Sequence, residues 1–130
     1  MRLNKINFAR AQAKNNEKNI DVEMIRSFVS ENKVKKYDGF VRRYTGEVLL
    51  NIDDKYLSEA DDWIRQAIEA NKRNGMRFQL GKDHALYAEL FKKKKDIDRA
   101  RENLSIAIDI FRECGADGWV EKYKEELAAM

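Results

Sequence analysis

The side chains that could carry out acid–base, nucleophilic or metal chemistry are few in this sequence. His84 is the one histidine and Cys114 the one cysteine among 130 residues. A metal site needs several His, Cys or carboxylate ligands that converge, and the sequence offers no partner set for either residue. We therefore interpret His84 as a packing or interface residue and Cys114 as a packing residue, and we expect no catalytic residue, no metal and no cofactor.

Two pairs of acids and one Gly-Lys dipeptide could do chemistry in other settings. Asp53-Asp54 and Asp61-Asp62 would need a cleft and a second group to act as general acid and base. Gly81-Lys82 lacks the earlier glycine and the following Ser or Thr of a phosphate loop. We interpret the first acid pair as a helix stop and the second as the outer face of a helix.

The sharpest charge run is Lys92–Lys95. It could contact a phosphate or an acidic peptide. It could also be a solvated helix end, where lysines complement the negative end of the helix dipole. Asp96 and Asp98 follow at once and reduce the local positive charge, so we favour the second interpretation.

Positive charge is concentrated in the first third of the chain. The net charge is +3, but residues 1–43 carry 11 Lys/Arg and 5 Asp/Glu, whereas 44–130 carry 15 and 18. The basic third could attract an acidic partner or form a solvated helical face. Only Tyr37, Phe40 and Tyr44 interleave its basic stretch, so binding of nucleic acid is a weakly supported alternative.

Apolar residues recur at helical spacing along the whole chain, which predicts an all-α fold. We expect helices over about 3–15, 21–34, 40–51, 56–74, 77–94, 97–113 and 117–130. Asp21 and Asp117 are expected to cap helices at the N-terminus, and Gly75 and Gly115 to end them. VLLNI (48–52) is the only strand candidate, and it lies inside the helical pattern.

The sequence repeats itself. Residues 55–75 align without a gap on 95–115, and 24–33 align more weakly on 63–72. Self-similarity at such a period predicts stacked helical hairpins that share one core. We expect three antiparallel hairpins and a final capping helix, which turns Trp119, Tyr123 and Leu127 inward.

The repeats resemble the tetratricopeptide family. Its small residues in the first helix of each hairpin would be Ala9, Gly46 and Ala88, and its second-helix pattern would be Ala60/Ile64/Ala67 and Ala100/Leu104/Ala107. The chain departs from the family in having no proline, and Arg42 and His84 replace the usual opening aromatic residue.

This resemblance implies a right-handed superhelical stack over one domain, residues 1–130. The repeats would span about 2–35, 39–75 and 81–115, with the capping helix at 117–130. More narrowly, residues 88–127 are similar to the C-terminal repeat region of large bacterial signalling proteins that carry an ATPase, cyclase or kinase. With no apolar run of membrane-spanning length and no secretory signal, we expect a cytoplasmic protein.

The resemblance also implies where a partner would bind, because tetratricopeptide arrays use the concave face made by their first helices. Carried over by alignment, the groove residues are Arg10, Lys14, Phe40, Arg43, Tyr44, Glu47, Asn51, Lys82, Glu89, Lys92 and Lys93. Six of these are basic and two are acidic, so the groove should prefer an acidic protein segment.

The resulting hypothesis is a non-catalytic protein–protein interaction module. The main alternative is self-association, either as a homo-oligomer or by docking on further repeats, through Leu3, Ile6 and Phe8. The second alternative is weak binding of nucleic acid by the basic first third. Because Glu47 and Glu89 occupy places where chaperone-binding members have amides or cations, we expect no binding of chaperone tails.

Overall fold

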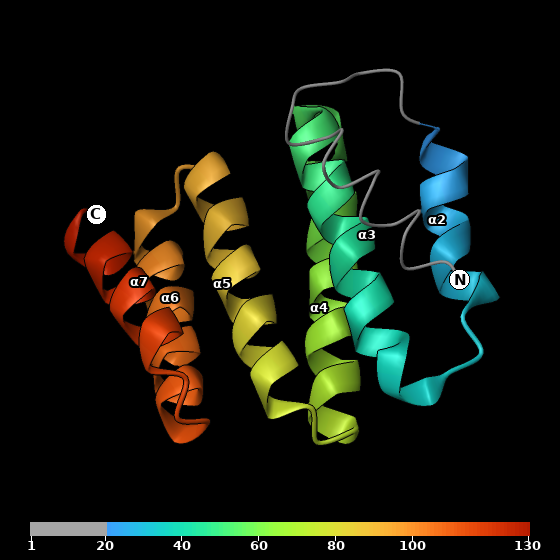
Figure 1. Ribbon diagram of the computed structural model, residues 1–130. Helices are drawn as coiled ribbons and strands as arrows, with labels where there is room; N and C mark the ends of the chain where they lie inside the picture. Colours follow the sequence, from blue (N-terminus) through green and yellow to red (C-terminus); the bar gives the residue numbers. More distant parts are fainter. Residues whose placement is uncertain (1–20) are drawn as a thin grey trace. The chain divides into compact units, whose positions relative to one another are not determined.

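The computed structural model describes residues 21–130, and this part of the chain is all-α, with no strand. The helices are α2 (Val22–Glu31), α3 (Asp38–Ile52), α4 (Leu57–Arg73), α5 (Arg77–Lys93), α6 (Ile97–Glu113) and α7 (Asp117–Ala128) (Figure 1). The predicted class is therefore confirmed, and VLLNI is helical. The expected helix over 3–15 lies outside the described residues.

Side chains cap the N-termini of α2 and α6, whereas α3, α5 and α7 begin without a side-chain cap. The Asp21 side chain accepts a hydrogen bond from the Met24 backbone N–H at 3.2 Å, as a capping residue does. The prediction that Asp117 caps α7 is wrong. Ala116 is the residue before the helix, and Asp117 is its first residue, where a negative charge still complements the helix dipole.

Three helix ends in the C-terminal half share one turn geometry. Backbone hydrogen bonds of 2.9 Å run from Met76 to Asn71, from Asp96 to Phe91 and from Ala116 to Phe111. The residue before each donor has positive φ: Gly75 (68°), Lys95 (62°) and Gly115 (70°). This is the Schellman ending of a helix. The sequence repeat aligns Gly75 with Gly115. The structure has a third turn of the same kind between them, in which Lys95 takes the place of the glycine.

The chain divides into two compact units, Met1–Ala70 and Asn71–Met130. In the first unit, α3 and α4 approach closely at Gly46. A Cβ on this residue would lie 3.0 Å from Ile64 Cγ1 and 3.3 Å from the Ala60 carbonyl oxygen. This contact explains the small residue predicted at Gly46. The fully buried side chains Ile25, Phe28, Leu49, Leu50 and Ile64 belong to the core of this unit.

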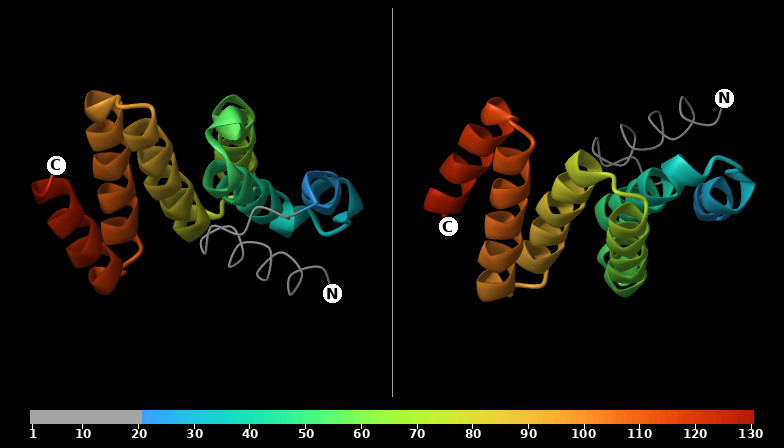
Figure 2. Two further views of the ribbon diagram at one scale, coloured as in Figure 1. Left: turned by 90° about the horizontal axis from the view of Figure 1, so that it is seen from above. Right: turned by 90° about the horizontal axis from the view of Figure 1, so that it is seen from below.

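In the second unit, α5, α6 and α7 lie side by side in chain order (Figure 2). Its buried cluster consists of Ala85, Ala107, Ile108, Phe111 and Val120, and the final helix packs Trp119, Tyr123 and Leu127 against it. These three side chains point inward as their spacing predicted. The closest helix approach is at Gly81, where a Cβ would lie 2.9 Å from Phe111 Cε1. Within residues 21–130, no helix combines the length and apolar character needed to cross a bilayer.

Candidate functional site

Side chains of α5 and α7 meet on one surface of the second unit. Its members are half-buried or exposed, and we call this surface the α5–α7 face: Phe78, Lys82, Lys92, Trp119, Lys122, Tyr123 and Glu126. The two helices begin forty residues apart, at Arg77 and Asp117, and each follows a turn with the same backbone hydrogen bond.

Trp119 is the fixed centre of the α5–α7 face. Its ring lies 5.5 Å from the buried ring of Phe111, nearly parallel to it, and 5.9 Å from Phe78 in an edge-on arrangement. Tyr123, one helical turn later, lies 6.0 Å away at 23°. Aromatic pairs at these distances are favourable beyond their buried area. The indole is therefore held in one position while part of it stays open to solvent.

Two lysines approach the indole of Trp119. The Nζ atoms of Lys82 on α5 and Lys122 on α7 each lie 5.1 Å from the ring centroid. Lys82 also lies 5.5 Å from the Phe78 ring. These are cation–π distances. The result is an aromatic surface flanked by positive charge on both helices.

An ion pair between Lys92 of α5 and Glu126 of α7 lies at the other end of the α5–α7 face. Lys92 Nζ lies 2.7 Å from Glu126 Oε1, and each side chain is about one-third exposed (34% and 30%). Lys92 was predicted as a groove residue from the sequence, and the structure shows that its charge is shared with α7.

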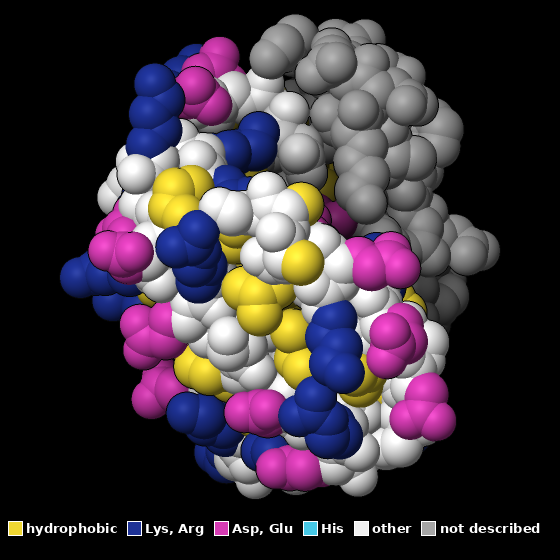
Figure 3. Space-filling model, turned by 90° about the vertical axis from the view of Figure 1, so that its left-hand side faces the viewer, with side chains coloured by type: hydrophobic (Ala, Val, Ile, Leu, Met, Phe, Trp, Pro, Cys, Tyr) yellow, Lys and Arg dark blue, Asp and Glu magenta, His cyan; other side chains and the backbone are white. Residues whose placement is uncertain are grey.

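The side of the molecule on which α7 lies shows a mixed surface. In Figure 3, several patches of apolar side chains lie across the middle of the view, with Lys/Arg and Asp/Glu side chains between and around them. An apolar centre with a charged rim is the usual anatomy of a protein interface.

The groove residues predicted on α3 are arranged differently. The Phe40 and Tyr44 rings stack edge to face at 4.3 Å, and the Arg43 guanidinium lies 5.4 and 5.3 Å from them. Yet Arg43, Tyr44 and Glu47 are only 4%, 7% and 8% exposed. The Asn51 side chain donates to the Glu47 carbonyl in its own helix. In this structure these residues present little surface to a partner, apart from half-buried Phe40 and Asn51.

The remaining predicted residues divide into two groups. Glu89 and Lys93 are exposed on α5, in the second unit. Arg10 and Lys14 lie outside the described residues. The sequence analysis missed Lys122 and Glu126 as site residues and placed Trp119 only in the core. The repeat carried a signal for Lys122, because it stands forty positions after Lys82.

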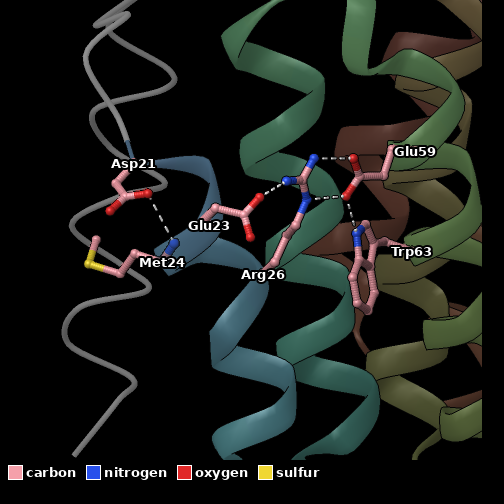
Figure 4. Close-up of polar contacts among 6 residues, drawn as sticks. All are labelled: Asp21, Glu23, Met24, Arg26, Glu59 and Trp63. Atoms are coloured by element: carbon pink, nitrogen blue, oxygen red, sulfur yellow. Dashed lines mark hydrogen bonds and ion pairs between the residues drawn. The ribbon is translucent and has the colours of Figure 1, made fainter.

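In the first unit, a polar network joins α2 to α4 (Figure 4). The Arg26 guanidinium donates two hydrogen bonds to Glu59, at 2.9 and 2.7 Å, and also contacts Glu23. The Trp63 indole N–H donates to Glu59 at 3.1 Å. The hydrogen bond from Arg26 lowers the pKa of the Glu59 carboxyl, and the pKa of Arg26 is raised. The network stabilises helix packing, and its acidic groups are already satisfied.

His84 and Cys114 are the two side chains whose types are most often reactive, and neither lies in a catalytic or metal-binding arrangement with other described residues. His84 is 9% exposed, and its Nδ1 lies 2.9 Å from Asn103 Oδ1. Burial lowers the pKa of the imidazole, so the neutral ring is favoured. Cys114 is exposed at the end of α6, so the interpretation of it as a packing residue is wrong. Residues 21–130 contain no group of three or more His, Cys, Asp or Glu placed to hold a metal ion.

Comparisons with protein-family models, with curated proteins and with solved structures found no match.

Proposed function

We propose that this protein is a non-catalytic protein–protein interaction module that binds an acidic partner segment on the α5–α7 face. The observation that carries the proposal is the half-buried indole of Trp119 with Lys82 and Lys122 each 5.1 Å from its ring. Tryptophan is among the residues most enriched at the energetic centres of interfaces. The flanking ammonium groups would favour carboxylates.

The tetratricopeptide resemblance supports the same surface. The family binds partners with the first helices of its hairpins, and α5 and α7 are the helices in those positions. A superhelical repeat array and a place in bacterial signalling belong to this proposal as well. Self-association through the N-terminal end and weak binding of nucleic acid remain the alternative outcomes.

The test is a comparative pull-down from host lysate, read by quantitative mass spectrometry. The baits are the wild-type chain, Lys82→Glu/Lys122→Glu, and a matched control, Lys33→Glu/Lys36→Glu, which makes the same charge change at exposed lysines of the other unit. Circular dichroism first shows that all three are folded. Arg43 is left unchanged because reversing a charge that is 4% exposed would destabilise the fold.

The proposal expects a protein that the wild type and the control capture and the Lys82/Lys122 variant loses. An acidic segment of that protein should then bind the purified chain with an affinity that falls as salt rises. Equal loss from both variants would show unspecific charge attraction. Equal capture by all three baits would show that the captured protein does not bind at the α5–α7 face.

A further inference from the structure

Three polar side chains at the junction of α4 and α5 stand where three aromatic rings stand at the junction of α6 and α7. The forty-residue offset pairs Asn71 with Phe111, Gln79 with Trp119 and Asp83 with Tyr123. The aromatic set is mutually stacked, with centroid distances of 5.5 to 6.0 Å. The polar set lies wholly in the second unit, like its aromatic counterpart.

The two junctions match in geometry as well as in sequence. Both turns are closed by a 2.9 Å backbone hydrogen bond, to the Asn71 carbonyl in one and to the Phe111 carbonyl in the other. The glycines that precede the two donors have φ of 68° and 70°. Across the first junction the Asn71 side chain bonds to Asp83, and across the second the Phe111 ring stacks on Tyr123 at 10°. Equivalent residues therefore meet in equivalent places.

The polar junction contains a buried acceptor that has no donor. Asn71 is 1% exposed and Asp83 is fully buried. The Asn71 side-chain amide donates a hydrogen bond from Nδ2 to Asp83 Oδ2, at 2.6 Å. The other polar atom of this side chain, Asn71 Oδ1, is buried without a hydrogen bond.

Gln79 also carries a buried acceptor oxygen without a hydrogen bond. This atom is Oε1, and the Gln79 side chain has other interactions. Gln79 lies one helical turn before Asp83 on α5, and its aromatic counterpart Trp119 contacts the counterparts of both other residues. Asn71 and Gln79, on either side of one turn, thus each carry a buried acceptor oxygen, and the counterparts of both residues are much larger rings.

We propose that the α4–α5 junction is a binding site for one ordered water molecule, which donates its two hydrogen bonds to Asn71 Oδ1 and Gln79 Oε1. Buried polar groups in folded proteins are satisfied by protein or by ordered water, and such waters make two to four hydrogen bonds. The water thus links the last turn of α4 to α5, as the stacked rings link the two helices of the α6–α7 junction.

A crystal structure of the full chain tests the site directly, at a resolution at which ordered waters are seen. The expected result is a density peak about 2.6–3.2 Å from both amide oxygens. A protein donor on Asn71 Oδ1, or no peak beside it, would overturn the proposal. A rubidium chloride soak separates water from a monovalent cation, because an anomalous peak at this place would show a cation site and refute the water.

Solution NMR supplies an independent readout. The Asn71 side-chain amide protons should show cross-peaks to a long-lived water, with opposite signs in NOE and ROE spectra. A Gln79→Leu variant removes one of the two acceptors and should weaken these cross-peaks, whereas Gln66→Leu, in the other unit, should leave them unchanged. Cross-peaks that are missing in the wild type, or unaltered by Gln79→Leu, would contradict the bridge.

Discussion

Lys95 holds the same left-handed backbone conformation as Gly75, with φ of 62° against 68°. Each residue lies in the turn that follows a helix, Gly75 after α4 and Lys95 after α5. An L-residue with a side chain is less stable in this region by roughly 1–2 kcal/mol, whereas glycine adopts it freely. A strained residue thus stands at the end of the lysine run Lys92–Lys95, which spans the end of α5.

Lys95→Gly should therefore stabilise the protein. The relief of strain is partly offset, by about 0.4–1 kcal/mol, because glycine also gives the unfolded chain more freedom. We expect a net gain of about 0.5–1 kcal/mol in the free energy of unfolding, measured by urea denaturation with an unchanged m-value. The control is Lys94→Gly, which removes the same charge at a residue with φ of −79°. A gain from Lys94→Gly as large as that from Lys95→Gly would contradict the explanation.

Local signals predicted most of the fold. The observed helices α3 to α7 begin and end within a few residues of the expected bounds, because Gly75, Gly115 and the acidic residues before the helices act on their own neighbourhood. The end of α5 was also expected, near residue 94, but the positive φ of Lys95 was not. No glycine stands at this position to indicate it.

The candidate site was less predictable, since exposure depends on tertiary neighbours. The alignment assigned Arg43 and Glu47 to a groove, and both are buried. It named Lys82 and Lys92 correctly as residues of α5, but their partners Trp119 and Glu126 lie on another helix. Sequence spacing predicts which residues share a face of one helix. The contacts of Lys82 with Trp119 and of Lys92 with Glu126 depend on how α5 and α7 pack in the folded protein.

Gly81→Val should destabilise the second unit. A Cβ at Gly81 would lie 2.9 Å from Phe111 Cε1 and 3.2 Å from Ile110 Cγ2, and the Phe111 ring is fully buried. Overpacking of this kind costs about 1–3 kcal/mol. Gly118→Val is the matched control, because nothing lies within 4 Å of a Cβ there, and a change of less than about 0.5 kcal/mol is expected. Thermal unfolding of both variants gives the comparison, and equal melting temperatures would refute the close approach.

The Arg26–Glu59 pair should show a measurable coupling energy. Each side chain is about one-third exposed (35% and 32%), so solvent screens the interaction, but its two hydrogen bonds favour the upper part of the range for such pairs. We expect about 1 kcal/mol from a double-mutant cycle with alanine at both positions. The cycle of Arg26 with Glu23, which is 81% exposed, should give only a few tenths. Equal coupling in the two cycles would contradict the specific role of Glu59.

The same pair makes a pH prediction. Because the pKa of Glu59 is lower in the folded protein than in the unfolded chain, the stabilisation is fully present above the unfolded value of 4.5. It is lost as the pH falls through the folded pKa. The wild type should therefore lose its stability advantage over Glu59→Gln in acid. An advantage that stays constant below pH 4.5 would show that the charge of Glu59 contributes nothing.

His84 should make the protein sensitive to mild acid. Burial lowers its folded pKa, with the hydrogen bond to Asn103 opposing and the nearby charges of Lys72 and Arg77 assisting. Above the unfolded value of 6.5 the imidazole is neutral in both states and the pH has no effect through it. As the pH falls below 6.5, the unfolded chain binds the proton first. Stability should then fall by at most about 1.4 kcal/mol per pH unit until the folded pKa is reached.

Urea denaturation between pH 7.5 and 5 measures this slope, and the control His84→Gln cannot titrate. A slope for the wild type no steeper than that of His84→Gln would mean that the buried ring does not resist protonation.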